Sequence, residues 1–409
     1  MKPMGSIPPG FFPNEDGRLL IDGEKVEALI ERAGDTPLFV YDFSLIRAKI
    51  ASLKEALPPT VGVHYAIKAN PMPELVMAIT PLVDGLDIAS EGELRIALAA
   101  GAQHISFAGP GKRDRELEAA ICAGITLNLE SEGEAARALS IAERLGITPK
   151  LAVRVNPDFD LKGSGMRMGG GAKPFGVDAD RAGDLVRVIR SAGADWRGFH
   201  IFAGSQALNS QAIADAQRQT LELAGRLAED VGECPPLVNL GGGFGIPYFP
   251  GEEAVDIQFV GQHLQESLDK RLEYLSETLF AVELGRYLVG EAGVYLTRIV
   301  DRKISRGEVF LVTDGGLHHQ LAASGNFGTV VRRNYPVAIA SRFGADPAEV
   351  ASIVGCLCTP LDRLADDVSL PHADVGDVVA VFMAGAYGFS ASPGNFLGHP
   401  PAQEILVGR

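Results

Sequence analysis

The stretch that decides the fold reads His64-Tyr65-Ala66-Ile67-Lys68-Ala69-Asn70-Pro71. Residues 61–66 are mostly β-branched, aromatic or small, which predicts a buried strand. Asn70-Pro71 ends this strand, because a proline and the residue before it disfavour regular structure. Lys68 therefore falls at the end of an apolar strand, where a charged side chain needs an explanation.

A lysine in this position must reach water or a partner, because a buried unpaired ammonium is costly. One chemical use is a Schiff base, since desolvation of a lysine frees its amine to act as a nucleophile. On this segment alone, a surface lysine just past a strand is the simpler interpretation. The polar residues in the rest of the chain favour the chemical one.

A regular alternation of strands and helices starts at residue 61, after a predicted strand at 37–41 and a helix at 43–57. The predicted strands are residues 61–68, 85–89, 104–108, 125–129, 150–155, 197–203, 237–240 and 279–284. The predicted helices lie near residues 72–80, 91–101, 113–123, 132–145, 179–192, 208–231 and 257–277. Ser90-x-x-Glu93 and Ser131-x-x-Glu134 have the spacing of capping boxes. Eight strands alternating with helices predict a (β/α)8 TIM-like barrel, with an open doubly wound sheet as the alternative.

The pattern changes after residue 285. Short segments rich in Val and Ile, broken by Gly, Pro and Asp, predict a mostly β domain. These segments are residues 293–301, 308–313, 329–332, 335–341, 350–355 and 376–383. We therefore expect a barrel domain at residues 36–285 and a β-rich domain at residues 286–409. Residues 1–35 are expected to join the β-rich domain, since chain termini often lie close together.

The composition is that of a globular protein large enough for two domains, with 409 residues, 46% hydrophobic and 22% charged. A net charge of -15 argues against a nucleic-acid partner, which would need a basic face. No apolar run is long enough to cross a bilayer, and the N-terminal residues lack the apolar core of a signal peptide. We expect a cytoplasmic protein without a membrane partner.

The four cysteines are Cys122, Cys234, Cys356 and Cys358, and they form neither a CxxC pair nor a disulfide framework. Cys356 and Cys358 are too close in sequence to make an ordinary structural zinc site without other ligands. His372 is the only histidine near them in the sequence that could serve. The sequence therefore gives no expectation of a bound metal.

Polar or glycine-rich residues follow every predicted strand of the barrel, where (β/α)8 barrels carry their chemistry. In chain order these positions are Lys68, Asp87 to Ser90, Gly109 to Lys112, Glu130, Arg154 to Asn156, His200 to Ser205, Gly241 to Gly245, and Glu283 to Arg286. Any one of them has an ordinary structural explanation. Their shared position at one end of the barrel predicts a functional site.

Two of these strand ends suggest how an anionic ligand is held. Gly241, Gly242 and Gly243 follow a late strand, where a glycine-rich loop lets backbone N–H groups approach a phosphate closely. The loop is neither GxGxxG nor a Walker motif, so a tight turn is the alternative. Glu283 and Arg286 either form an ordinary ion pair, or hold a protonated ring nitrogen and an anion respectively.

The series HYAIKANP, GLDIASEGEL, ISFAGPGK, RVNPD, GSQ, LGGGFGIPY, ELGR, TDGG, GCLCTPLD and GAYG occurs in one order. This series resembles the fold-type III pyridoxal-phosphate decarboxylases, which include the diaminopimelate and ornithine decarboxylases. The resemblance runs from about residue 36 to 407. HIFAGSQ and GSGMRMGGGAKPFGVD resemble the subgroup associated with exosortase A systems.

The resemblance implies an alanine racemase-like (β/α)8 barrel that binds pyridoxal 5'-phosphate (PLP) and decarboxylates an amino acid. Lys68 would form the Schiff base with the cofactor, and Glu283 would keep the pyridine nitrogen protonated. The residues expected around the phosphate are Gly241, Gly242, Gly243, Ser205, Arg286 and Tyr387. Asp87 and Arg154 are further strand-end candidates for cofactor contact.

The same resemblance implies a head-to-tail homodimer with two shared active sites. Cys358 and Asp362 would reach the active site of the partner subunit. Cys358 would be the catalytic residue that manages protonation of the product carbanion. The partners expected from the sequence are thus a second copy of this chain and a small amino-acid substrate.

The chain departs from the family pattern beside the cofactor. Family members carry His-x-Gly-Ser with the histidine stacked on the cofactor ring, whereas Phe202 stands three residues before Ser205 here. His200 lies five residues before Ser205 and shares a strand face with Phe202. Either side chain could provide the stacking face, and an ordinary core histidine at position 200 is a third interpretation.

The positions that recognise the substrate also differ. Relatives place an acidic residue directly after the partner cysteine to bind a distal amine, but this chain has Thr359 there. A site without that charge would bind a cationic tail poorly. We therefore do not expect free diaminopimelate, ornithine or lysine to be the preferred substrate. His318 and His319 either contact substrate or lie in an exposed loop.

The leading hypothesis is a PLP-dependent carboxy-lyase acting on an amino acid or a derivative. Its substrate could be bound to a carrier protein, which would explain the missing charge, or the chain could be a diaminopimelate decarboxylase proper. An amino-acid racemase on the same barrel would place an arginine at the pyridine nitrogen, and Glu283 argues against it. A non-catalytic cofactor-binding homologue is the remaining alternative.

Overall fold

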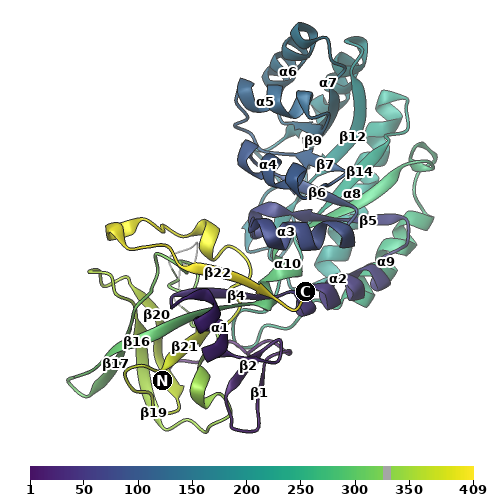
Figure 1. The fold of residues 1–409 in the computed structure, drawn as a ribbon. Coiled ribbons are helices and arrows are strands. Elements are labelled where there is room, and N and C mark those ends of the chain that lie inside the picture. Colours follow the sequence, from purple (N-terminus) through teal and green to yellow (C-terminus); the bar gives the residue numbers. More distant parts are fainter. Residues whose placement is uncertain (326–332) are drawn as a thin grey trace. The chain divides into compact units, whose positions relative to one another are not determined.

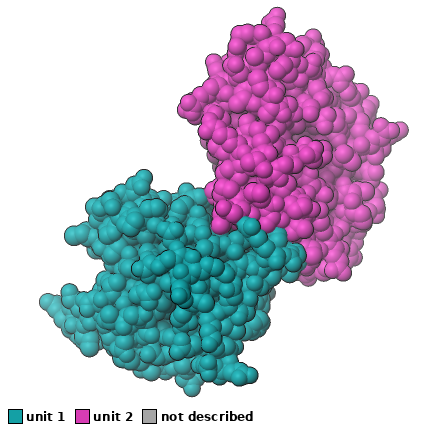
Figure 2. Space-filling view, in the orientation of Figure 1, with its two compact units in different colours: residues 1–48, 247–253, 286–409 teal, residues 49–246, 254–285 magenta. Residues whose placement is uncertain are grey.

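The computed structural model describes residues 1–325 and 333–409, and for Arg167 the backbone only. The chain divides into two compact units, shown in Figure 2. Unit 1 comprises Met1–Ala48, Pro247–Glu253 and Arg286–Arg409, and unit 2 comprises Lys49–Ile246 and Ala254–Gly285. The barrel was expected to start at residue 36, but residues 36–48 belong to unit 1.

Unit 2 is a closed barrel of eight parallel strands (Figure 1). In chain order the strands are β5 (Val61–Ala66), β6 (Gly85–Ile88), β7 (Ile105–Phe107), β8 (Thr126–Leu129), β9 (Lys150–Asn156), β12 (Asp195–Ile201), β14 (Leu237–Gly242) and β15 (Leu279–Leu284). Strand β8 pairs with β9, and β15 pairs with β5, so the sheet closes on itself. The (β/α)8 barrel predicted from the sequence is confirmed, and the open doubly wound sheet is excluded.

Seven helices follow the strands along the chain. They are α3 (Pro73–Ile79), α4 (Glu91–Ala99), α5 (Asp114–Cys122), α6 (Glu132–Leu145), α7 (Ala179–Ser191), α8 (Ser210–Val231) and α9 (Ile257–Asp269). Ser90 and Ser131 cap α4 and α6 by accepting from the backbone N–H groups of Glu93 and Glu134. Each glutamate accepts from the residue before the cap instead of from the cap itself, so only half of each predicted capping box forms.

The helix predicted at residues 257–277 is too long. Helix α9 ends at Asp269, Leu272 has extended backbone angles, and residues Glu273–Leu275 form a 3-10 turn. Leu272 packs against Gly225 of α8, where an added Cβ would lie 2.7 Å from the leucine side chain. The apolar residues at helical spacing therefore extend beyond the end of α9, because Leu272 and Leu275 lie in the segment that follows the helix and not in the helix itself.

Unit 1 is built on a β-sheet with the order β18-β21-β16-β17-β19-β20, with β4 pairing to β16 and β22. The strands are β4 (Leu38–Asp42), β16 (Gly293–Ser305), β17 (Glu308–Thr313), β18 (Val337–Ile339), β19 (Glu349–Val354), β20 (Arg363–Leu370), β21 (Val378–Val381) and β22 (Gln403–Val407). Strand β4 explains why residues 36–48 join this unit, since its partners lie in the C-terminal part of the chain. The predicted strand at 329–332 lies outside the described residues.

The rest of unit 1 consists of short elements. Strands β1 (Phe12–Pro13), β2 (Leu19–Ile21) and β3 (Glu24–Lys25) form a small sheet, followed by α1 (Val26–Ala33). Helix α2 (Phe43–Ala56) runs across the boundary between the units, and α10 (Arg286–Val289) follows β15. Among the described residues, no helix combines the length and apolar character that a bilayer crossing requires.

Candidate active site

The carboxyl ends of the barrel strands surround a pocket of about 350 Å³ in unit 2. Five different strands contribute to it, either directly or through the loop that follows them. Among its lining residues are Lys68, Asp87, Gly109, Arg154, Phe175 and Glu283. The pocket lies at the end of the barrel where the sequence predicted a functional site, because parallel strands of a barrel bring all their carboxyl ends to one face.

Lys68 lies in a short 3-10 turn, Ile67–Ala69, directly after β5. Its side chain is 46% exposed, and its Nζ lies 3.7 Å from Glu283 Oε1 on the neighbouring strand β15. The Phe202 ring lies on the same side, with its centroid 5.6 Å from Nζ. Lys68 is thus reachable from the pocket and faces an acidic group and an aromatic ring.

Glu283 is buried and is held by His200, whose Nε2 lies 2.9 Å from Glu283 Oε2. Burial alone raises the pKa of a carboxyl group. Here the hydrogen bond from His200 and the positive charges of Lys68 and Arg154 outweigh burial, so the pKa of Glu283 is lowered well below its usual range. Glu283 is therefore ionised near neutral pH, and His200 must donate the hydrogen bond between them.

The contact between His200 and Glu283 bears on which of the two residues before Ser205, His200 or Phe202, is placed beside Lys68. His200 is almost fully buried and its Nε2 is used by Glu283, while Phe202 is partly exposed and lies beside Lys68. The two rings are 6.4 Å apart and tilted by 58°. The aromatic face nearest to the Lys68 amine is therefore that of Phe202.

A second histidine–carboxylate pair lies next to Lys68. His64 Nδ1 is 3.3 Å from Asp87 Oδ2, and both side chains are buried. Burial lowers the pKa of His64, but the charge and hydrogen bond of Asp87, together with the nearby carboxylates, outweigh it, so the net shift of the His64 pKa is upward. Gly85 is required beneath this histidine, because a Cβ there would lie 2.7 Å from His64 Nε2.

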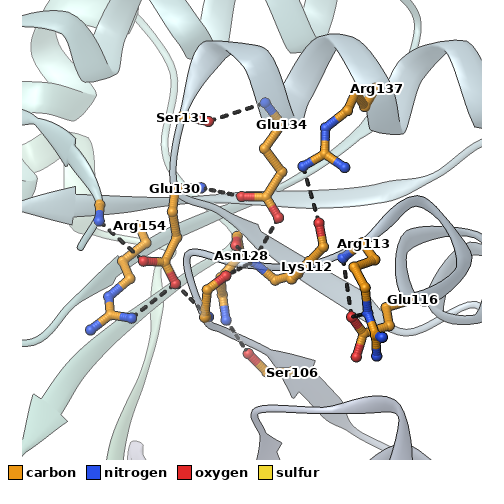
Figure 3. A network of polar contacts seen from close by, with 12 residues as sticks. Ser106, Lys112, Arg113, Glu116, Asn128, Glu130, Ser131, Glu134, Arg137 and Arg154 are labelled. Carbon is orange, nitrogen blue, oxygen red and sulfur yellow. Dashed lines mark hydrogen bonds and ion pairs between the residues drawn. The ribbon is translucent and has the colours of Figure 1, made fainter. Parts of the chain in front are cut away.

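Lys112 is the other lysine that lines the pocket, and it is held in a different way (Figure 3). Its side chain is only 1% exposed, and its Nζ donates to Gly109 O at 2.7 Å, to Asn128 O at 2.8 Å and to Glu134 Oε1 at 2.7 Å. All three N–H groups of the ammonium are therefore used. Lys112 stabilises the loop after β7, and Lys68 is the lysine placed to react.

Glu130 joins this loop to Arg154, as Figure 3 shows. Its Oε1 accepts from Arg154 Nη1 at 2.9 Å and from the backbone N–H of Gly109, and its Oε2 accepts from Gly176 N at 3.2 Å. The charges of Arg154 and Lys112 lower the pKa of Glu130, although burial alone would raise it. Arg154 therefore positions one wall of the pocket through Glu130, a role that the sequence did not predict.

The glycine-rich segment at the end of β14 packs tightly against the neighbouring backbone. A Cβ at Gly241 would lie 2.6 Å from Ile201 O, and one at Gly243 would lie 2.2 Å from Gly204 O. Both glycines have positive φ, a conformation that favours glycine. Ser205, at the end of β13 (Gly204–Ser205), has a buried Oγ without a hydrogen-bond partner among the described residues. A bound phosphate would satisfy such a hydroxyl.

Arg286 and Tyr387 belong to unit 1, where they are in contact. The Arg286 guanidinium lies 4.8 Å from the Tyr387 ring centroid and donates to Tyr248 Oη at 2.8 Å. Within the described residues no carboxylate pairs with Arg286, although the group is largely buried. Arg286 therefore keeps capacity for an external anion. Tyr248 was missed by the sequence analysis, because a tyrosine in a loop carries no distinctive pattern.

The loop at residues 355–362, also in unit 1, carries Cys358, Thr359 and Asp362. Cys358 is exposed, and Thr359 Oγ1 accepts from Leu361 N at 3.3 Å. Asp362 is only 2% exposed, and its two oxygens accept from Leu317 N at 2.7 Å and from Leu357 N at 2.8 Å. Asp362 thus shapes the loop that presents Cys358, and its contact with substrate stays a prediction.

His318 and His319 do not lie in an exposed loop, which was one of the two expectations. Both side chains are buried, with His318 0% and His319 2% exposed. They follow the turn after β17, where Gly315 and Gly316 allow the close approach of Tyr295 and Asp362. Neither histidine is presented to solvent within this chain, because the loop folds back onto the sheet.

Comparison with known proteins agrees with this geometry. The family model described as pyridoxal-dependent decarboxylase, pyridoxal binding domain, matches residues 43–290. The chain is 38% identical over 397 residues to an L-glutamyl-[BtrI acyl-carrier protein] decarboxylase of Niallia circulans, covering 94% of this chain and 92% of that one. It is 33% identical over 410 residues to a diaminopimelate decarboxylase of Methanothermobacter thermautotrophicus, covering 98% and 92%.

Among solved structures, the chain superposes on a diaminopimelate decarboxylase of M. jannaschii in co-complex with L-lysine. The TM-score is 0.87 at 27% identity, with 97% of this chain and 92% of that one covered. The barrel and its pocket therefore define a cofactor-binding decarboxylase of fold type III. The chain belongs to the pyridoxal-dependent decarboxylase family, its cofactor is pyridoxal phosphate, and its reaction is the removal of a carboxyl group from an amino-acid substrate.

The pocket fits this cofactor. It offers an accessible lysine for the aldehyde, an ionised carboxylate for the pyridine nitrogen and, in the same unit, a buried unpaired hydroxyl beside a glycine-rich backbone for the phosphate. When bound, the cofactor supplies the electron sink that stabilises the carbanion left by carbon dioxide. The chain's own residues have to bind the cofactor, orient it and control protons around it. Assignment to the subgroup associated with exosortase A systems stays a prediction.

Proposed function

We propose that this decarboxylase acts on an amino acid whose side chain ends in no ammonium group, presented as a thioester on a carrier protein. The observation that carries this proposal is the chemistry of the loop at residues 355–362. Thr359 follows Cys358, and the single carboxylate of the loop, Asp362, is buried and bonded to two backbone N–H groups. The loop therefore offers a cationic tail no carboxylate comparable to that of the relatives.

The chemistry of decarboxylation fixes where a tether could be attached. The α-amine must be available to the cofactor, and the α-carboxylate must be available to leave. A carrier can therefore be attached only through a side-chain carboxyl, as in a γ-glutamyl thioester. Such a tail is neutral, so it requires no charged partner, which agrees with Thr359. The relative at 38% identity bears the name of a decarboxylase of a carrier-bound glutamyl group.

The residue roles follow from the site geometry. Lys68 would hold the cofactor through its Nζ, and Glu283 would keep the pyridine nitrogen protonated. His200 keeps Glu283 ionised and oriented, and Phe202 provides the stacking face beside Lys68. These roles are supported by the 3.7 Å and 2.9 Å contacts of Glu283 and by the position of the Phe202 ring.

The active unit in this proposal is a homodimer with shared sites. Cys358 is exposed on a loop that Asp362 holds in place. An exposed thiol on a structured loop is suited to reach the site of a second copy and to direct the returning proton. Arg286 and Tyr387, which lie in contact within unit 1, stay predicted phosphate ligands. Cytoplasmic location stays an expectation from the sequence.

The test compares three substrates with the purified holoenzyme by measuring carbon dioxide release. They are free L-glutamate, meso-diaminopimelate and the γ-L-glutamyl thioester of a holo acyl-carrier protein, with the pantetheine thioester as a small analogue. We expect kcat/KM for the carrier thioester to exceed that for either free amino acid by about 100-fold or more, since binding energy from the carrier adds to that of the amino acid. Equal or faster turnover of diaminopimelate would contradict the proposal.

Diaminopimelate decarboxylase is the second candidate function. It is favoured by the relatives of that name, which are 31–33% identical over nearly the whole chain. Its difficulty is the loop at 355–362, which would leave the distal ammonium of the substrate without a carboxylate from this segment. The same three-substrate experiment separates the two candidates.

A further inference from the structure

Unit 1 brings together three side chains of the types that bind transition metals. They are His318, Cys356 and His399, and one ligand atom from each lies within 4.8 Å of the others. Cys356 Sγ is 3.9 Å from His399 Nδ1, and the His318 and His399 ring centroids are 5.2 Å apart. The three residues come from three separate loops, so their meeting is a result of the fold and not of local sequence.

His318 has an unusual environment for a buried histidine. It is 0% exposed, and neither Nδ1 nor Nε2 has a hydrogen-bond partner among the described residues. Its neighbour His319 is also buried, but both of its ring nitrogens are bonded, to Tyr295 Oη at 3.0 Å and to Pro400 O at 2.9 Å. Leaving buried polar atoms unpaired is unfavourable, so the His318 nitrogens need a partner that the described residues do not supply.

The three loops are held next to one another by other residues. Asp362 accepts from Leu317 N and from Leu357 N, which links the residue before His318 to the residue after Cys356. His319 bonds Pro400 O, which links the residue after His318 to the residue after His399. A Cβ at Gly316 or Gly355 would lie 2.2 Å from an Asp362 oxygen, so both glycines are required for this linkage. The three ligands are therefore positioned in advance.

We propose that His318, Cys356 and His399 bind one divalent ion of the zinc class, with three protein ligands and a fourth position open to water or another small ligand. A thiolate and two imidazoles are the ligands that zinc prefers. In a tetrahedral site with bonds of about 2.0–2.3 Å, neighbouring ligand atoms lie roughly 3.3–3.7 Å apart. Cys356 Sγ and His399 Nδ1 are 3.9 Å apart, close to this range, and all three ligand atoms lie within 4.8 Å of one another, so the loops must contract by about 1 Å or less around the ion.

The protonation states agree with this assignment. Burial, together with the charges of His319 and His399, lowers the pKa of His318 to about 4, so its ring is neutral and can donate a lone pair at pH 7. Burial and the charge of Asp362 raise the pKa of the Cys356 thiol to about 11. Zinc binding at Cys356 requires loss of the thiol proton, as at any cysteine ligand.

The ion would act on the loop that carries Cys358. Cys356 is two residues from Cys358, and Cys358 itself is exposed and is not among the three ligands. An ion at Cys356 would tie this loop to the segments of His318 and His399 by bonds much stronger than the present hydrogen bonds. This inference concerns unit 1 alone and does not depend on which substrate the enzyme uses.

The experiment measures metal binding by the untagged full-length protein after chelator treatment and dialysis. Zn²⁺ is titrated against a chromophoric chelator, and Co²⁺ is used as a spectroscopic substitute whose thiolate and ligand-field bands report the ligand set. We expect one ion per chain and a cobalt–thiolate band. Cys356→Ser and His399→Ala should weaken zinc binding by more than about 100-fold, since even loss of an outer-shell partner costs 10–100-fold.

Two variants control for the general loss of a thiol or an imidazole. Cys358→Ser removes the neighbouring exposed thiol, and His104→Gln removes an exposed histidine of unit 2, so both should keep one ion and the cobalt–thiolate band. Circular dichroism and thermal unfolding establish that each variant is folded. Substoichiometric binding by the wild type, or a cobalt spectrum that Cys356→Ser leaves unchanged, would overturn the proposal.

Discussion

His200 Nε2 lies 2.9 Å from Glu283 Oε2, and this contact joins β12 and β15, which lie on either side of β14 in the barrel. The carboxylate has a lowered pKa because His200, Lys68 and Arg154 outweigh the effect of burial. In the proposed function, His200 therefore acts on the cofactor through Glu283 as a positioning residue. In the family pattern a histidine stacks on the cofactor ring. In this chain Phe202 is the ring that lies beside Lys68.

Replacement of His200 by Phe should remove the hydrogen bond to Glu283 while an aromatic ring still fills the buried space. Without its hydrogen-bond donor, Glu283 loses an interaction worth about 1.5–3 kcal/mol, and the pKa of Glu283 rises. A carboxyl with a lowered pKa loses its charge only as pH falls through that low value, so the wild type should keep activity far into the acid range. In His200→Phe the acid limb of kcat/KM should move to higher pH. His104→Gln, at an exposed position, should leave the limb in place, and a wild-type profile in His200→Phe would contradict the positioning role.

Covalent attachment of the cofactor should depend on Lys68 and not on Lys112. Borohydride reduction of the holoenzyme followed by peptide mass mapping should place the adduct on the Lys68 peptide, because all three N–H groups of Lys112 are bonded. Lys68→Ala should lower kcat by about 10³-fold or more, since the covalent step is lost. Lys303→Ala, at an exposed position of β16, is the control and should behave as wild type. An adduct on the Lys112 peptide would contradict the assignment.

The Phe202 ring should contribute directly to cofactor affinity. Phe202→Ala removes the aromatic face beside Lys68, and stacking contacts are worth about 0.5–1.5 kcal/mol, so the Kd for pyridoxal phosphate should rise about 2–10-fold. Phe202→His keeps an aromatic ring and should recover most of this loss. Titration of the apoenzyme, followed by absorbance, measures both variants, with exposed Phe12→Ala as the control. Equal affinity in Phe202→Ala and the wild type would show that the ring does not stack.

The buried pair Lys112–Glu134 should matter to stability far more than an exposed pair does. Glu134→Gln leaves the ammonium of Lys112, which is 1% exposed, without its charge partner, and such a loss costs about 3–5 kcal/mol. The double variant Lys112→Met with Glu134→Leu should lose less, because neither charge of this pair is then left without its partner. Urea unfolding gives the free energies, and Arg218→Ala in the exposed pair with Glu222 should cost less than about 1 kcal/mol. Equal losses in Glu134→Gln and the double variant would argue against a charge effect.

The parts of this protein that sequence reasoning could predict are those set by local periodicity. All eight barrel strands were placed because each is a short apolar run, and their polar ends identified Lys68, Glu283 and Arg154 as neighbours. Strand β20 was missed because its charged residues hide the pattern. Asp366 is buried there, with its carboxylate bonded to Arg363 of the same strand and its backbone bonded to Asn334, which only the fold brings near.

Contacts between distant segments could not be predicted in this way. His318, Cys356 and His399 are separated by dozens of residues and fit no ligand spacing, so the sequence carried no expectation of a metal and offered only His372 near the cysteines. In the structure His372 is paired with Glu349 and Asp374. The sequence also could not favour His200 or Phe202 as the proposed stacking residue, because both side chains share a strand face. The structure favours Phe202, since His200 is bonded to Glu283.

Shared active sites can be tested by mixing two inactive variants. Lys68→Ala removes the cofactor lysine, and Cys358→Ala removes the exposed thiol that is proposed to serve the partner's site. If subunits exchange freely, about half of the dimers are mixed, and each mixed dimer has one intact site of two, so about one quarter of wild-type activity should return. Mass spectrometry of an isotope-labelled mixture confirms that exchange has occurred. Full exchange without recovered activity would show that Lys68 and Cys358 of the same chain work together, and the head-to-tail dimer would then have to be abandoned.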